Sequence, residues 1–155
     1  MRVIFIDADA CPVKDEIYKV AKRYNLAVKV VANSTMRTPA DPSVEMVVHL
    51  GFGAVDDWIA ENAGAGDIVV TADIPLAARS IEKGARVLDS KGHAITESTI
   101  GGKLATRDIM EERRQAGERT GGPSAMTPKD RSRFLSQLDT YCNAVLKAHP
   151  RRGAS

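Results

Sequence analysis

Aromatic residues and cysteines are scarce in this chain of 155 residues. Phe, Tyr and Trp make up 5% of it, and there are two cysteines, Cys11 and Cys142. Two cysteines exclude a disulfide framework of the kind found in small secreted domains, and we expect both thiols to be reduced. They cannot form a tetrahedral zinc site alone. The few aromatic residues lie mostly at helical core spacing, which argues against a base-stacking platform.

Long apolar runs are also missing. No run approaches the roughly 18 residues that a membrane span needs, and the chain begins with a strand pattern and aspartates rather than with a secretion signal. We therefore expect a cytoplasmic protein without a membrane partner. With 43% hydrophobic and 27% charged residues, the composition is typical of an ordinary globular domain. We expect one domain over residues 1–149 and a disordered tail at 150–155.

Charge is nearly balanced overall but unevenly distributed. Residues 1–100 hold 11 Lys and Arg against 14 Asp and Glu, whereas residues 101–155 hold 11 against 6. An acidic front half and a basic back half suit a metal site beside a surface that binds a polyanion. The alternative is a solvated helical surface, and the sequence leaves both interpretations open.

Strand and helix patterns alternate through residue 90. Apolar runs predict strands at residues 2–6, 27–32, 44–50, 68–71 and 85–88. Helical spacing predicts helices at residues 12–24, 55–63 and 74–83, and later at 98–114. Thr127 and Pro128 are an N-cap and a first helical residue for a last, amphipathic helix. Such alternation predicts the α/β class, with a parallel sheet covered by helices on both faces.

Two of the predicted strands end in aspartate. The run Val3–Ile6 leads to Asp7, with Asp9 two residues further on, and the run Ile68–Thr71 leads to Asp73. In open parallel sheets, ligands bind beyond the carboxyl ends of the strands, where the strand order reverses. If the first strand is central, Asp7 and Asp73 lie on either side of that point. Clustered carboxylates there typically hold a hard divalent cation such as Mg²⁺ or Mn²⁺.

Each of these acids also has a plainer interpretation. Asp7 follows a strand and is a common turn residue. Asp9, Asp56 and Asp73 each precede or begin a predicted helix, where aspartate commonly caps the free amides of the first turn. Thr71 is either a strand former or a ligand for phosphate. The matching ends of two strands favour a site over four unrelated structural roles.

Four segments resemble the YaiI/YqxD family of bacterial proteins, in order over nearly the whole chain. They are DADACP at 7–12, VVTADIPLA at 69–77, TRDIMEERRQAG at 106–117 and TGGP at 120–123. That family is placed in the PIN-like superfamily, whose members are typically metal-dependent ribonucleases. The resemblance implies a three-layer α/β/α PIN-like fold, with a mainly parallel five-stranded sheet in the order 3-2-1-4-5 and extra C-terminal helices.

The resemblance also implies site residues. It gives catalytic roles to Asp7 and Asp73, and a Mg²⁺ or Mn²⁺ site formed by Asp7, Asp9, Asp56 and Asp73. It places substrate binding at Asn33, Arg37, Arg107, Asp108, Gly121 and Gly122. The chain departs from the family pattern at Gly53, since relatives tend to carry Asp in a GFD sequence there. Asp56 or Asp57 would have to replace that acid.

Three functions follow from these residues. The first is a metal-dependent nuclease that hydrolyses RNA phosphodiester bonds or acts on another phosphate-bearing substrate. The absence of an acid at Gly53 supports a second, a non-catalytic module that binds a nucleotide or RNA. The third is a small-molecule phosphatase, because a D-x-D sequence after the first strand also begins the haloacid-dehalogenase-like phosphatases. The third ranks last because the pair Asp56-Asp57 precedes the strand that ends at Thr71, which is the wrong order for those enzymes.

Overall fold

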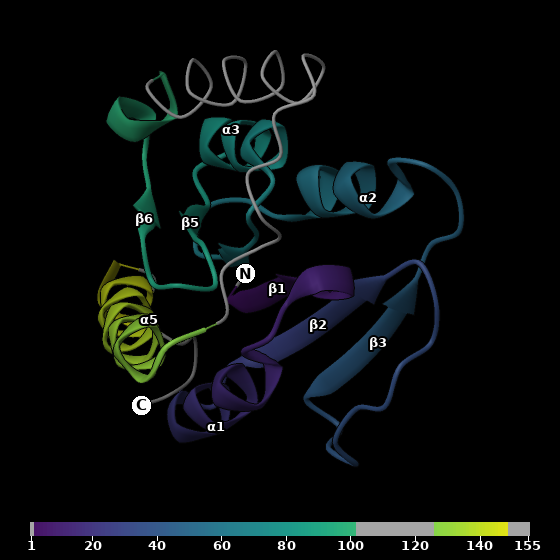
Figure 1. The fold of residues 1–155 in the computed structure, drawn as a ribbon, viewed down its shortest axis with the longest axis horizontal. Helices are drawn as coiled ribbons and strands as arrows, with labels where there is room; N and C mark the ends of the chain where they lie inside the picture. Colours follow the sequence, from purple (N-terminus) through teal and green to yellow (C-terminus); the bar gives the residue numbers. More distant parts are fainter. Residues whose placement is uncertain (1, 102–125, 149–155) are drawn as a thin grey trace.

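A six-stranded sheet forms the centre of the computed structural model, which describes residues 2–101 and 126–148. The strand order is β3-β2-β1-β4-β5-β6 (Figure 1). Strands β1 to β5 are parallel, and β6 runs antiparallel to β5. The predicted order of the first five strands is confirmed. The strands are β1 (Val3–Asp7), β2 (Ala27–Ala32), β3 (Val44–Val48), β4 (Ile68–Val70), β5 (Arg86–Leu88) and β6 (Ala94–Ile95).

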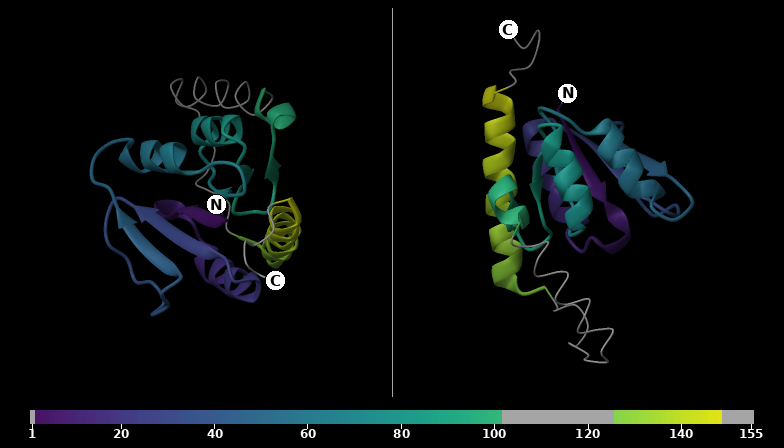
Figure 2. Two further views of the ribbon diagram at one scale, coloured as in Figure 1. Left: turned by 180° about the vertical axis from the view of Figure 1, so that it is seen from behind. Right: turned by 90° about the horizontal axis from the view of Figure 1, so that it is seen from above.

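Helices cover both faces of this sheet and give the expected three α/β/α layers (Figure 2). One face packs against α1 (Lys14–Tyr24) and α5 (Pro128–Ala148). The other face packs against α2 (Ala54–Asn62) and α3 (Ile74–Glu82). A short 3₁₀ helix, η1 (Ala8–Ala10), connects β1 to α1. Because η1 intervenes, α1 begins at Lys14 and not at Pro12 as predicted.

Strand β1 is central because both of its faces are apolar. Ile4 and Ile6 are fully buried in the cluster formed with α1 and α5. Val3 and Phe5 point the opposite way and are buried in the cluster formed with α2 and α3. A strand covered on both faces carries a continuous apolar run instead of an alternating one. This packing places the end of β1, and with it Asp7, in the middle of the sheet edge.

The sheet has one strand more than predicted. After β5 the chain turns at Asp89, whose Oδ1 accepts the backbone N–H groups of Lys91 and His93 at 3.0 and 2.9 Å. Gly92 lies in this turn at φ +86°, and a Cβ there would stand 2.5 Å from the backbone of Arg133 in α5. The prediction of five strands is wrong because a two-residue strand is too short to leave a periodic pattern.

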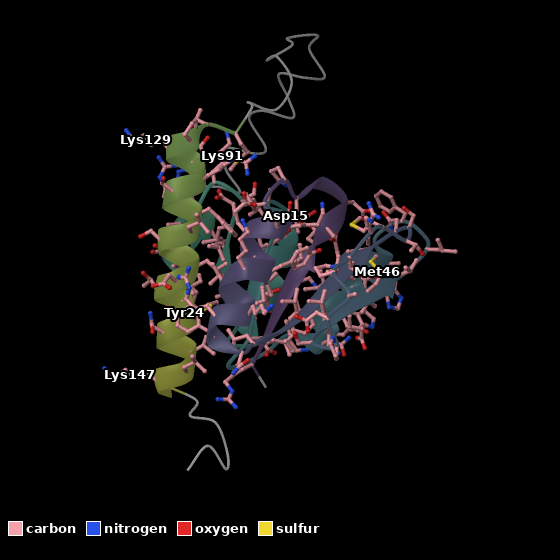
Figure 3. All side chains as sticks on the ribbon, turned by 90° about the horizontal axis from the view of Figure 1, so that it is seen from below. Asp15, Tyr24, Met46, Lys91, Lys129 and Lys147 are labelled. Atoms are coloured by element: carbon pink, nitrogen blue, oxygen red, sulfur yellow. The ribbon has the colours of Figure 1, made fainter. Side chains whose placement is uncertain are left out.

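Helix α5 begins as predicted. Thr127 Oγ1 accepts the backbone N–H of Asp130 at 3.0 Å, and Asp130 Oδ2 accepts the N–H of Thr127 at 3.1 Å. This reciprocal pair satisfies two free donors of the first turn. Further along, Tyr24 of α1 lies between the two helices (Figure 3) and donates its hydroxyl proton to Asp139 of α5. These contacts fix α5 against α1 and the sheet.

Part of the predicted structure lies outside the described residues. The helix predicted at 98–114 is seen at its beginning, where residues 97–101 are helical. Its remainder and the predicted tail at 150–155 lie outside the described residues, as do Arg107, Asp108, Gly121 and Gly122. None of the helices that the structure describes is both long enough and apolar enough to cross a membrane.

Candidate functional site

A single buried hydroxyl group connects the ends of β1 and β4. Thr71 Oγ1 donates a hydrogen bond to Oδ2 of Asp7 at 2.8 Å and accepts the backbone N–H of Asp73 at 3.0 Å. The two strands are paired neighbours, with Ile6 opposite Val70. They are also the strands between which the sheet order reverses. The structure thus brings Asp7 and Asp73 to the shared edge at which the sequence places them.

Asp73 also caps α3. Its Oδ1 accepts the backbone N–H of Leu76 at 2.9 Å, and Pro75 occupies the first turn of the helix. The structural interpretation of Asp73 is therefore correct, and it does not compete with a role in a site. One carboxylate oxygen is used by the cap, and the cap fixes the orientation of the side chain.

Asp56 joins the site from the first turn of α2. Burial, together with the negative charges of Asp73 and Asp7, raises the pKa of Asp56 to about 6. Burial also raises the pKa of Asp7, aided by the charges of Asp73 and Asp9 and opposed by the hydrogen bond from Thr71. We refer to Asp7, Asp56 and Asp73 as the acidic cluster. Its members come from three segments that are distant in sequence, and repulsion of this kind is typical of carboxylates that share a site.

Asp57 has its own ion-pair partner, although its charge is among those that raise the pKa of Asp56. It forms an ion pair with Arg79 at 2.8 Å, and both side chains are exposed. Of the two acids that the sequence offers in place of an acid at Gly53, the structure therefore places Asp56 in the cluster. The alternative in which Asp56 caps α2 is wrong. Gly53 is the N-cap, at φ +74°, and the helix start has no side-chain cap bond among the described contacts.

Asp9 and Asn33 form a chain of hydrogen bonds beside the cluster. Both carboxylate oxygens of Asp9 accept the backbone N–H of Asn33, at 3.2 and 3.0 Å. The side-chain amide of Asn33 in turn donates to the carbonyl oxygens of His49 and Gly51, at 3.1 and 3.5 Å. This chain connects η1 to the loop after β3. The alternative in which Asp9 caps the first helix is wrong, since Val13 is the N-cap of α1.

The remaining predicted substrate-binding residue within the described part is Arg37. It is exposed in the connection between β2 and β3. Its proposed contact with substrate stays a prediction, as do the metal-binding role of Asp9 and the substrate-binding role of Asn33.

Basic residues gather near the start of α5. Arg131 pairs with Glu16 of α1 at 2.6 Å, and Arg133 pairs with Asp130 at 3.3 Å. These two arginines are therefore partly neutralised within the fold. Lys91 and Lys129 lie at the same end of the molecule (Figure 3). This end includes the turn after β5, so positive charge lies at the carboxyl edge of the sheet.

The acidic cluster does not form a ready-made cage for a metal ion. Within residues 2–101 and 126–148, no three acidic, imidazole or thiol groups stand close enough together to hold one ion. One oxygen of Asp7 and one of Asp73 are instead engaged with Thr71 and Leu76. Mg²⁺ in proteins is usually held by one or two carboxylates, with water and substrate phosphate as its other ligands. The donor set consists of hard carboxylate oxygens, which is compatible with such a site.

Thr71 is the residue whose role sequence reasoning missed. Its hydroxyl accepts the N–H group two residues later, a local turn that Thr and Ser form before many helices. The T-x-D spacing is a signal for that turn. The hydrogen bond that Thr71 donates to Asp7 has no signal in the local sequence, because the two residues are 64 positions apart.

Comparisons with known proteins agree with the resemblance described above. The family model described as "Uncharacterized BCR, YaiI/YqxD family" matches residues 5–144. A UPF0178 protein of Rhodopseudomonas palustris (strain BisB18) is 54% identical over 147 residues, which cover 94% of this chain and 95% of the relative. A UPF0178 protein of Brucella ovis is 58% identical over 138 residues, which cover 88% of this chain and 86% of the relative.

A third relative extends the match slightly further. The UPF0178 protein of Caulobacter sp. (strain K31) is 54% identical over 149 residues, with 96% of this chain and 97% of the relative covered. No solved structure matches the chain. On the strength of the family model and of these relatives, the chain belongs to the YaiI/YqxD family.

Proposed function

We propose that this protein is a metal-dependent nuclease that hydrolyses RNA phosphodiester bonds at the acidic cluster. The observation that carries the proposal is the Thr71 bridge, which joins the carboxylate of Asp7 to the backbone of Asp73 at the reversal of strand order. Ligands of open α/β sheets bind at this kind of point. Carboxylates gathered there suit a hard cation and, through it, a phosphate group. The cytoplasmic location expected from the sequence belongs to the same proposal.

Hydrogen bonds orient the two carboxylates that would hold the cation. Thr71 engages Oδ2 of Asp7, and the N–H of Leu76 engages Oδ1 of Asp73. In the proposal, Asp7 and Asp73 would hold Mg²⁺ or Mn²⁺ between them. When bound, such an ion polarises a phosphoryl oxygen and lowers the pKa of water. Asp9 positions the neighbouring loop through Asn33.

The proposed reaction is hydrolysis with a proton relay through Asp56. The oxygen of a water molecule forms a bond to phosphorus, while the bond between phosphorus and one ester oxygen breaks. Asp56 takes one proton from the attacking water, and the departing ester oxygen takes a proton from solvent. Asp56 then returns its proton to solvent. The products are a phosphate monoester and an alcohol. Without a cation, the pKa of Asp56 is raised to about 6. A cation held by Asp7 and Asp73 would lower it, so that Asp56 would be ionised and able to accept a proton at neutral pH.

A second candidate is a module that binds a nucleotide or RNA without cleaving it. Two points favour it: the chain has Gly53 where the resemblance implies an acid, and no three ligand groups are preassembled among the described residues. Both candidates require Asp7 and Asp73 to hold a phosphate through a cation. They differ in whether the bound strand is cut.

Cleavage of a labelled single-stranded RNA in Mn²⁺ tests the first candidate. Asp7→Asn removes a charge from the cluster but keeps an acceptor for Thr71, so we expect it to fold and to lose cleavage. Glu82→Gln is the matched control, because Glu82 is an exposed acid at the last residue of α3, and we expect it to cleave normally. Equal cleavage by wild type and Asp7→Asn, purified in parallel, would contradict the proposal. Binding of Mn²⁺ and RNA without cleavage would favour the second candidate.

A further inference from the structure

Two large apolar side chains stand in solvent on the loop between β3 and α2. Leu50 is 80% exposed and Phe52 is fully exposed, at 109%. Gly51 and Gly53 on either side of Phe52 have φ of +107° and +74°, a conformation that glycine adopts readily. Single exposed hydrophobic residues are ordinary in proteins. This pair differs from such single residues in its position beside the acidic cluster and in the contacts that hold its loop.

The loop is held at its base. The side-chain amide of Asn33 donates to the carbonyl oxygens of His49 and Gly51. The ring of His49 lies 5.5 Å from the ring of Trp58 in α2. These contacts fix the backbone that carries Leu50 and Phe52. The two side chains themselves stay exposed and can contact a partner.

The loop also leads directly into the acidic cluster. Gly53 is the N-cap of α2, and Asp56 lies in the first turn of that helix, four residues after Phe52. Strand β3 is separated from β1 by β2 alone, so the two strand ends are about 10 Å apart. That distance corresponds to roughly three stacked nucleotides at about 3.4 Å each. A strand whose phosphate lies at the cluster therefore reaches the loop within a few nucleotides.

Other residues along the same edge of the sheet extend the surface that such a strand would cross. Following the strand order, the edge carries Phe52 after β3, the acidic cluster at β1 and β4, and Lys91 after β5. Lys129 lies at the same end of the molecule (Figure 3). An apolar ring, a cluster of carboxylates proposed to bind a cation, and the lysines Lys91 and Lys129, of which Lys129 is exposed, suit the base and the phosphates of one nucleic-acid strand.

A second copy of this chain is a less suitable partner. Strand β3 lies at the edge of the sheet, but the connection between β2 and β3 runs along its outer side (Figure 1). Met36 of that connection packs against the core. Covering an edge in this way is a common means of preventing strand pairing between copies.

We propose that Phe52, supported by Leu50, stacks against an unpaired nucleobase of a nucleic-acid strand bound at the acidic cluster. This inference relies on the proposed function for the position of the strand. It revises the expectation, drawn from the scarce aromatic residues, that no stacking platform exists. Stacking needs an exposed π-face and tolerates any base, so Phe52 discriminates between unpaired and paired strands and not between sequences.

The test is binding without cleavage. With Ca²⁺, a hard cation that carboxylates bind, in place of Mg²⁺ and Mn²⁺, fluorescence anisotropy measures the binding of a labelled single-stranded 12-nucleotide RNA to the full chain. We expect Phe52→Ala to weaken binding about ten-fold or more, whereas Phe52→Tyr binds like wild type. Leu135→Ala is the matched control, since Leu135 is also exposed but lies on α5. A duplex of the same sequence is expected to bind wild type and Phe52→Ala equally.

A second readout reports contact directly. Phe52→Trp places an indole in the loop, and we expect single-stranded RNA to quench its emission well beyond any change from Trp58 in wild type. Several results would overturn the inference: equal binding by wild type and Phe52→Ala, no binding by wild type, or a change in sedimentation that assigns the surface to self-association. Binding that depends on Phe52 without any cleavage in Mn²⁺ would retain the stacking site and reject the nuclease.

Discussion

The hydroxyl of Thr71 donates a 2.8 Å hydrogen bond to the carboxylate of Asp7, a residue 64 positions earlier in the chain. Because Thr71 also accepts the backbone N–H of Asp73, one buried side chain contacts the carboxylate of one acid and the backbone of the other. A hydrogen bond to the charged form of a carboxylate favours ionisation. Thr71 therefore opposes the burial that raises the pKa of Asp7. In this protein, the position and the charge of the acidic cluster depend on the same hydroxyl group.

Thr71→Val is expected to disturb the cluster without removing any acid. The substitution keeps the shape of the side chain but removes the donor to Asp7, so the pKa of Asp7 rises further and Mn²⁺ binding weakens. The loss of a hydrogen bond to a charged group lowers the free energy of unfolding by about 2 kcal/mol. Calorimetric titration with Mn²⁺ and thermal unfolding measure the two effects. Thr71→Ser keeps the hydroxyl, so its Mn²⁺ binding and its free energy of unfolding should match those of wild type. Mn²⁺ binding by Thr71→Val at the wild-type level would argue against a positioning role for Thr71.

Asp73 has two roles that matched substitutions separate. Its Oδ1 caps α3 through the N–H of Leu76, and asparagine retains that acceptor. We expect Asp73→Asn to be nearly as stable as wild type but unable to bind Mn²⁺. Asp73→Ala should lose both functions, with a cost of about 1 kcal/mol for the missing cap. Thermal unfolding and Mn²⁺ titration of the two variants check this, and strong Mn²⁺ binding by Asp73→Asn would remove Asp73 from the metal site.

The raised pKa of Asp56 leads us to expect a specific dependence of stability on pH. Its pKa is raised from 3.8 to about 6 in the folded chain, so between these values the folded state binds more protons than the unfolded state. In the absence of divalent ions, the free energy of unfolding should therefore fall as the pH rises from about 4 to about 6. Burial and the charges of Asp73 and Asp7 are the cause.

Asp56→Asn should remove this component. At pH 7.5 without divalent ions, we expect the variant to be more stable than wild type by roughly 1 kcal/mol, after allowing for screening by solvent. That corresponds to an increase in Tm of about 3 °C. The difference should vanish below pH 4, where Asp56 is protonated. Thermal unfolding across this pH range measures it, and a variant less stable than wild type at pH 7.5 would contradict the proposed repulsion.

The strands that carry Asp7 and Asp73 at their ends are predictable from strong local patterns, whereas the strand order is implied by the family resemblance. A strand buried on both faces has a continuous apolar run, and Val3–Ile6 and Ile68–Val70 are such runs. The start of α5 is equally local, since Thr127 and Asp130 cap each other within one turn. Strand β6 has no comparable signal because it consists of two residues.

The contacts that organise the site are harder to predict because they join distant residues. Asp9 accepts a backbone N–H from Asn33, 24 residues away, where the sequence suggests a helix cap or a metal ligand. The exposure of Phe52 is also invisible in the sequence, since an aromatic residue between two glycines is compatible with either a core or a surface position. In both cases the packing of β2 and β3 decides the outcome.

The position of Gly53 offers the most direct test of how the cluster is completed. Gly53 is the N-cap of α2, and a Cβ there would meet nothing within 4 Å. Its φ of +74° is one that Asp and Asn tolerate better than most residues. We expect Gly53→Asp to fold at a cost of about 1 kcal/mol and to bind Mn²⁺ several-fold more tightly, since it adds a carboxylate three residues before Asp56. Gly53→Asn, which offers the same backbone and capping group without the charge, should bind Mn²⁺ like wild type. Equal Mn²⁺ affinities for the two variants, measured by calorimetry at one pH, would show that an acid at this position does not contribute to the metal site.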